Sequence, residues 1–110
     1  MNDTLDRDAI KSALDQLPDW RIDSDSLLTS FAAPTAGAAL ALVAAIGEVA
    51  EEANHHPDVD WRYDHVFVLT TSHDVGSKIT QRDVDLATRI SSLAGAAGAV
   101  AEPDNGRRGA

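Results

Sequence analysis

The sequence has no cysteine among its 110 residues. This absence excludes disulfide bonds, catalysis by thiols and zinc sites built from thiolates. Basic side chains are also scarce: nine Lys and Arg stand against 18 Asp and Glu, and the formal net charge is −9. Because nucleic acids and anionic membrane surfaces are bound through clustered Lys and Arg, this composition argues against both as partners.

The sequence also lacks a hydrophobic run long enough to cross a bilayer. Its longest apolar stretch, residues 36–50, is rich in alanine and is interrupted by Gly37 and Gly47. The first six residues do not carry the basic and apolar pattern of a signal peptide. We therefore expect a soluble, cytoplasmic protein.

A chain of 110 residues is long enough to fold as one domain around its own core without disulfides or metal. We expect this domain to span residues 1–95. Residues 96–110 are rich in Gly and Ala and end in a polar segment, a composition typical of disorder. We expect them to form a disordered C-terminal tail.

Apolar residues recur with helical spacing in three segments, residues 6–17, 36–54 and 80–94. Asn54 suits the C-terminus of the second helix, and Pro57 drives the chain after it into an extended conformation. The sequence therefore predicts three helices, the second of which ends just before a pair of histidines.

Four short segments have the alternating, β-branched or aromatic composition of strands: residues 20–22, 27–32, 59–63 and 65–71. In the third, Trp61 and Tyr63 alternate with charged residues, and we expect both to pack in the sheet. We place the turn that follows at Asp64–His65. The order α-β-β-α-β-β-α predicts an α+β fold, a two-layer sandwich in which a four-stranded antiparallel sheet is covered by helices.

Three of the four histidines gather around this second helix end and the strand that follows. His55 and His56 directly follow the end of the helix, and His73 follows the last strand. Imidazole can give and take a proton near neutral pH, so the three side chains predict a proton-transfer pocket. Taken alone, however, adjacent histidines at a helix C-terminus are more often surface residues that suit the helix dipole.

A metal site is an alternative for the same residues. His55, His56 and His73 with a carboxylate could satisfy zinc. Consecutive residues seldom direct both rings at one ion, however, and the sequence has no pair of histidines four residues apart. We therefore favour acid–base chemistry over a metal site.

The spacing around the histidines resembles the signature of one known family, the pterin-4a-carbinolamine dehydratases. The resemblance covers residues 17–93 and departs from the usual pattern mainly at Ser72 and in the loop at residues 76–80. Its anchors, in order and with three, five and nine residues between the first four, are Glu51, His55-His56-Pro57, Tyr63, His73 and then Asp83.

This resemblance implies dehydration of 4a-hydroxytetrahydropterin to quinonoid dihydropterin and water, which recycles the cofactor of aromatic amino-acid hydroxylases. It implies that a pterin is the substrate and that no separate cofactor is needed. His55 and His73 would supply the acid and the base, in an order that the sequence leaves open. His56 would hold the pterin or share in proton transfer.

Three carboxylates complete the predicted site. Glu51 lies one helical turn before His55, so it could orient that ring or raise its basicity. Asp74 could contact the amide-like edge of the pterin. Asp83 could bind or orient near the pocket, although the segment Thr80–Asp83 also fits a helix capping box, which is its more common role. His65 has no counterpart in the signature, and we expect it to be structural.

A second reading of the same fold is a non-catalytic protein. Relatives of the family act as a dimerisation cofactor of a transcriptional coactivator or as an assembly chaperone, although members that have dropped catalysis tend to lose the histidines. In either case the resemblance implies a homodimer or homotetramer. The alanine-rich second helix offers a slim apolar face for packing between subunits.

Overall fold

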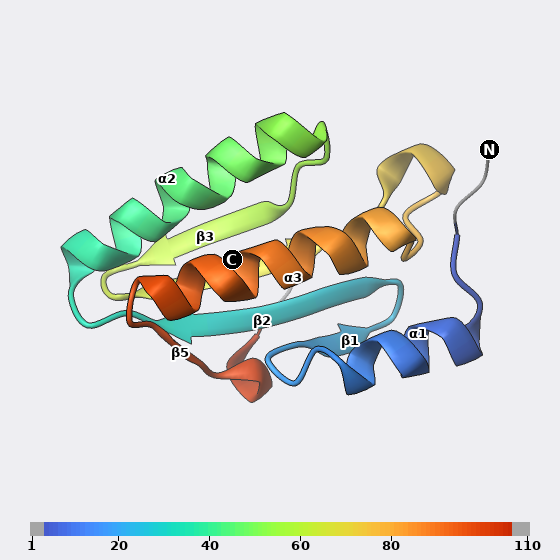
Figure 1. Ribbon diagram of the computed structural model, residues 1–110, viewed down its shortest axis with the longest axis horizontal. Helices are drawn as coiled ribbons and strands as arrows, with labels where there is room; N and C mark the ends of the chain where they lie inside the picture. The colour runs from blue at the N-terminus through green and yellow to red at the C-terminus, as the bar shows by residue number, and fades with distance from the viewer. Residues whose placement is uncertain (1–3, 107–110) are drawn as a thin grey trace.

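The computed structural model of the protein describes residues 4–106 and forms an α+β sandwich (Figure 1). The sheet is antiparallel, with its four main strands in the order β1-β2-β4-β3. Figure 1 shows α2 and α3 lying over the same face of this sheet. The predicted fold class and element order are confirmed. The elements are α1 (Arg7–Asp15), β1 (Arg21–Asp23), β2 (Ser26–Ala32), α2 (Ala36–Ala53), β3 (Asp58–Arg62), β4 (His65–Thr70) and α3 (Gln81–Ala96), with short 3-10 turns η1 (His73–Val75) and η2 (Pro103–Asn105) and a two-residue strand β5 (Val100–Ala101).

The core lies between the sheet and the helices. Alternate residues of β2 and β4 face α2 and α3, as the period of two along a strand requires. The helices pack their own apolar stripes against these residues. Trp20 is 1% exposed and packs edge-on against Phe31, with ring centroids 6.3 Å apart. Its indole N–H donates to Ser91 Oγ at 2.9 Å, which ties the start of β1 to α3. The largest fully buried apolar side chains of this cluster are Trp20, Leu27, Phe31, Leu42, Ile46, Val66, Val68, Leu86 and Ile90.

The end of α2 fixes the direction of the two histidines. Asn54 adopts a left-handed conformation (φ 51°) and its N–H bonds to the carbonyls of Ala50 and Glu51, a cap that Asn and Gly form most readily. The next N–H, of His55, also bonds to the Ala50 carbonyl, at 3.1 Å. The chain therefore leaves the helix axis sharply, with His55 buried and His56 exposed.

The prediction that Trp61 and Tyr63 pack in the sheet is wrong. The strand order places β3 at the edge, and the two side chains are 45% and 77% exposed. The hairpin turn is also displaced by one residue, because Arg62 pairs with His65 and the two residues between them make the turn. Tyr63 takes the left-handed conformation (φ 54°) that this turn needs.

The prediction of a disordered tail is corrected for residues 96–106. Strand β5 pairs with Phe31 and Ala32 at the end of β2, next to the edge that β1 occupies. The Glu102 N–H donates to the Ser30 carbonyl at 2.7 Å, and Asp104 pairs with Arg21 at 3.0 Å. Residues 107–110 lie outside the described part of the chain.

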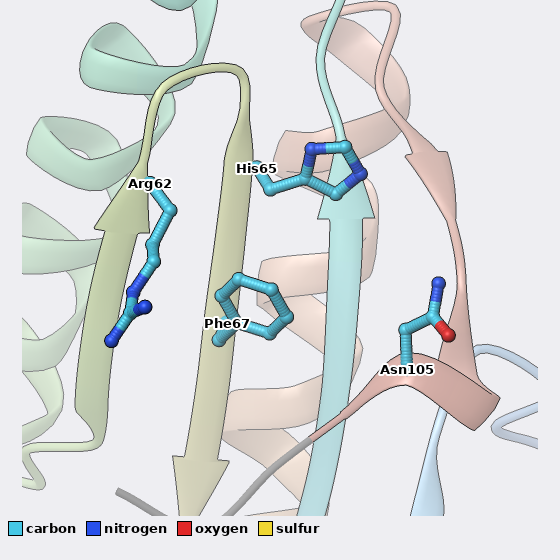
Figure 2. Close-up of a pocket in the computed structure, with 4 residues that line it drawn as sticks. All are labelled: Arg62, His65, Phe67 and Asn105. Carbon is cyan, nitrogen blue, oxygen red and sulfur yellow. The ribbon is translucent and has the colours of Figure 1, made fainter. Parts of the chain in front are cut away.

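His65 is structural, as expected, and it holds this C-terminal segment. Its Nδ1 lies 2.7 Å from Asp64 and its Nε2 lies 3.0 Å from Glu102. Figure 2 shows the ring at the start of β4, above Phe67, with Asn105 of η2 facing the same pocket. The hydrogen bond to Asp64, assisted by the one to Glu102, outweighs partial burial and raises the pKa of His65.

Within residues 4–106, no helix combines the length and the apolar character that a membrane span requires.

Candidate functional site

The three predicted histidines line one pocket. It has a volume of about 330 Å³ and lies where α2 ends, η1 follows β4 and α3 begins. Figure 1 shows these three segments together at one end of the fold. The predicted residue Asp74 also lines the pocket, together with three residues that were not predicted for the site: Asn54, Thr71 and Arg82. The lining is Asn54, His55, His56, Thr71, His73, Asp74 and Arg82.

His55 is the buried member of the three histidines, with a side chain 8% exposed. Its Nε2 lies 2.6 Å from Oδ1 of Asp83, a carboxylate on the first turn of α3 that has no exposed surface. Asp83 therefore orients the His55 ring, a role that the sequence analysis gave to Glu51. It also forms the capping box with Thr80, so both roles considered for Asp83 are present.

The buried Asp83 carboxylate is surrounded by donors. Thr70 Oγ1 donates to Oδ1 at 2.5 Å, while Ser72 Oγ and the Thr80 N–H donate to Oδ2 at 2.7 and 2.9 Å. A buried carboxylate is stabilised in its charged form by such bonds. A charged Asp83 can only accept, so His55 must donate from Nε2. The lone pair of the neutral ring is then on Nδ1.

Glu51 lies elsewhere than predicted. Its carboxylate bonds to Nε2 of His56 and not to His55. The left-handed cap at Asn54 redirects the chain before the histidines. Residues four positions apart are therefore no longer neighbours on one helix face there. This second pair is open to solvent, since the His56 and Glu51 side chains are 56% and 78% exposed. Glu51 therefore acts on the outer imidazole.

His73 reaches the pocket from η1 and is exposed. The backbone of its turn closes through Gly76, which has the positive φ of 79° that glycine adopts without strain. The ring's Nδ1 lies 3.4 Å from Ser77 Oγ. His73 can thus exchange protons with water while it faces the same pocket as the buried His55.

An ion pair lies on the wall beside His73. Arg82 donates to Asp74 at 3.0 Å, and this hydrogen bond lowers the pKa of the Asp74 carboxyl. Arg82 was missed from the sequence, although it directly precedes Asp83 in the segment that resembles the family pattern. The pair presents both donors and acceptors to the pocket.

Among residues 4–106, no three His, Asp or Glu side chains converge in a way that could hold a metal ion. What the residues do provide is three imidazoles with different surroundings. One is buried against a carboxylate, one is exposed beside a carboxylate, and one is exposed with a hydroxyl nearby. This arrangement suits proton transfer to and from a bound molecule.

Comparison with known proteins gives a consistent result. A family model described as pterin 4 alpha carbinolamine dehydratase matches residues 3–93. A protein of Thermomicrobium roseum is 40% identical over 90 residues, which cover 82% of this chain and 96% of that protein. A protein of Nocardia farcinica is 41% identical over 90 residues, covering 82% of this chain and 94% of its own. Both are provisionally named pterin-4-alpha-carbinolamine dehydratases.

Two solved structures share the fold. A Brucella melitensis protein, described as a transcriptional coactivator/pterin dehydratase, superposes with a TM-score of 0.78 at 25% identity, over 83% of this chain and 98% of its own. A pterin dehydratase-like protein described as a RuBisCO assembly factor of the alpha-carboxysome gives a TM-score of 0.57 at 21% identity, over 69% of this chain and 87% of its own. At that identity, the second likeness concerns the fold alone.

Proposed function

Since the chain belongs to the pterin 4 alpha carbinolamine dehydratase family, we propose that it is an active enzyme that dehydrates 4a-hydroxytetrahydropterin. The observation that carries this proposal is the pocket in which three histidines meet, one of them fixed by a buried carboxylate. A protein that used this fold only for assembly would have no need of an imidazole held in one tautomer.

The reaction requires two proton transfers and no external electrons. The C4a–O bond breaks, and the hydroxyl group leaves as water after receiving a proton from a general acid. The N5–H proton passes to a general base, and its electron pair forms the C4a=N5 double bond of the quinonoid product. The proton that the acid gives and the proton that the base takes balance, so the enzyme returns to its starting state after one exchange with water.

We assign the base to His55 and the acid to His73. With Nε2–H donated to Asp83, neutral His55 carries its lone pair on Nδ1, and the ionised carboxylate stabilises the imidazolium that forms when that nitrogen takes a proton. His73 is exposed and can be reprotonated from solvent after each turnover. His56, paired with Glu51, would hold the substrate or relay protons at the pocket mouth.

The Asp74–Arg82 pair suits the pyrimidine edge of the pterin. That edge carries an N3–H and a 2-amino group, which donate, and the 4-oxo group, which accepts. The Asp74 carboxylate, kept ionised by Arg82, can accept the two donors, and the guanidinium can donate to the oxygen. This contact would place N5 and C4a toward the histidines.

The direct test is the rate at which freshly generated 4a-hydroxytetrahydropterin loses water, followed by ultraviolet absorbance. The wild-type protein should accelerate the spontaneous reaction, and His55→Ala and His73→Ala should each lose at least tenfold of that acceleration. His65→Gln is the matched control, because it alters a histidine outside the pocket. A wild-type rate equal to that in buffer would refute the proposal that the protein is a dehydratase and would favour the non-catalytic assembly role.

We also propose that the protein self-associates. Leu40 on α2 and Val59 and Trp61 on the edge strand β3 are apolar yet 48%, 36% and 45% exposed, and apolar side chains gathered on neighbouring elements commonly mark interfaces. Light scattering should give a dimer or tetramer for the wild type and a smaller species for Trp61→Glu. A wild-type monomer at high protein concentration would contradict this proposal.

A further inference from the structure

Three adjoining pockets form a row along one end of the molecule. The histidine pocket shares Thr71 and His73 with a second pocket of about 290 Å³. The second shares Asp25 with a groove of about 470 Å³ between α1 and β1. Figure 1 shows the end of α2, η1, the β1–β2 turn and α1 along the same end of the fold. The three pockets therefore adjoin one another through shared wall residues, in a row that starts at the proposed reaction site.

The far groove combines an apolar floor with cations. Ile10 and Leu14 of α1 face Ile22 of β1, which is 45% exposed. Arg7 and Lys11 are four residues apart on α1, so they lie on one face of the helix beside this floor. An apolar surface next to two positive charges suits a ligand group that has an apolar body and ends in an anion.

The charge of this groove is unusual for the chain. Of the seven Lys and Arg within residues 4–106, four are held by carboxylates: Arg21, Arg62, Arg82 and Arg89. Arg7, Lys11 and Lys78 have no ion-pair partner in that part of the chain. In a protein with a net charge of −9, two of these three available cations therefore flank a single groove.

Two carboxylates distinguish the middle pocket. Asp25 and Asp58 line it from the β1–β2 turn and the start of β3, together with His73 and Ser77. The Thr71 hydroxyl in the same wall is already used, since it donates to the Asp25 carbonyl at 2.8 Å. Two carboxylates at this point suit a group that donates N–H or O–H bonds and would repel an anion placed there.

We propose that the row binds one extended substrate, a pterin whose C6 substituent carries an N–H linker and an aryl body that ends in carboxylate. The pterin ring occupies the histidine pocket, and the linker passes between Asp25 and Asp58. The aryl body lies on the Ile10–Ile22 floor and the carboxylate meets Arg7 and Lys11. This inference rests on the proposed function and selects a substrate class for the same site.

Equilibrium binding of two unreactive analogues to the full chain tests the proposal. Calorimetry would compare 7,8-dihydrofolate, which has the N–H linker, aryl body and carboxylates, with 6-methyl-7,8-dihydropterin, which has none of them. We expect the wild type to bind dihydrofolate at least tenfold more tightly. Arg7→Gln/Lys11→Gln should lose about tenfold for dihydrofolate, the sum of two exposed ion pairs, and leave binding of the methyl compound unchanged.

Lys78→Gln is the matched control, because it removes a cation that lines none of the three pockets. Thermal unfolding of each variant separates lost binding from lost folding. Equal affinities for the two analogues, or an equal loss in Lys78→Gln, would overturn the extended-substrate inference. If the methyl-substituted 4a-hydroxypterin is nevertheless dehydrated, the proposed function stands without it. Failure to bind either analogue would overturn the inference, and failure to dehydrate as well would overturn the proposed function.

Discussion

Replacement of Asp83 by asparagine separates the two roles of this side chain. The wild-type carboxylate accepts from His55 and Thr70 on Oδ1 and from Ser72 and the Thr80 N–H on Oδ2. Asparagine keeps the shape but offers one oxygen and one NH2 group. One of the two donor pairs must therefore face a donor.

The better arrangement for the variant can be derived from the partners. If the NH2 replaces Oδ2, the buried Thr80 N–H has nothing to bond to, because a backbone N–H cannot reverse. If the NH2 replaces Oδ1, the Thr70 hydroxyl can turn to accept, and His55 can accept after its proton moves to Nδ1. The Asp83→Asn protein should therefore fold, with a stability loss of about 1–3 kcal/mol, and with His55 in the opposite tautomer.

The kinetic consequence is much larger than the structural one. With its proton on Nδ1, His55 has no lone pair on the ring nitrogen that the wild type leaves available. Loss of one acid–base group corresponds to about 10²- to 10⁴-fold in rate. Dehydration kinetics give this number, and nitrogen chemical shifts of the His55 ring report the tautomer directly.

Ser72→Ala is the matched control for this prediction. It removes one donor to Oδ2 but leaves the His55–Asp83 bond in place. We expect about 1 kcal/mol of lost stability and a rate close to that of the wild type. A folded Asp83→Asn protein with the wild-type rate would refute the reasoning, and so would equal rate losses in the two variants.

The pKa of His65 is raised by its carboxylate partners, so its contribution to stability is fully present below the unfolded pKa of about 6.5 and disappears as pH rises through the raised value. The charged groups that face the ring are Asp64, Glu102 and nearby Arg62. The free energies of unfolding of wild type and His65→Gln, measured with denaturant, should therefore differ most at acidic pH. A difference that grows with pH would contradict this assignment. Asn54→Val should lower the stability by about 1–2 kcal/mol, because a β-branched residue is strained in the left-handed conformation, whereas Asn54→Gly should be nearly neutral. Thermal unfolding would measure both changes. Equal losses of stability in the two variants would show that the cap is not left-handed in solution. Trp20→Phe removes the indole donor to Ser91 and should cost about 1–3 kcal/mol by denaturant unfolding, whereas an unchanged midpoint would mean that this bond does not anchor β1.

Local patterns predicted the elements well where neighbouring residues decide the outcome. The cap at Asn54, the break at Pro57 and the capping box at Thr80 depend on side chains within a few residues of the backbone groups that they satisfy. The exposure of Trp61 depends instead on which strand lies at the edge of the sheet, and no local pattern carries that order. Strand β5 was missed because its two residues are too few to show the alternating pattern of a strand.

The candidate site shows the same division between local and distant determinants. Sequence spacing selected all three histidines as candidate site residues, since each lies just after the end of a helix or a strand. It assigned Glu51 to His55 by counting residues along an ideal helix, and that counting fails after the left-handed Asn54. The true partner of His55 is Asp83, 28 residues further along the chain, where sequence alone indicated mainly a helix cap.

The two roles of Asp83, as helix cap and as partner of His55, depend on one another, because the same bonds that begin α3 at Thr80 hold the carboxylate in the position from which it fixes the imidazole. A helix N-terminus that places an ionised side chain against a histidine thus couples the folding of α3 to the proton chemistry of the pocket. Variants that loosen this cap should therefore lose activity before they lose the fold.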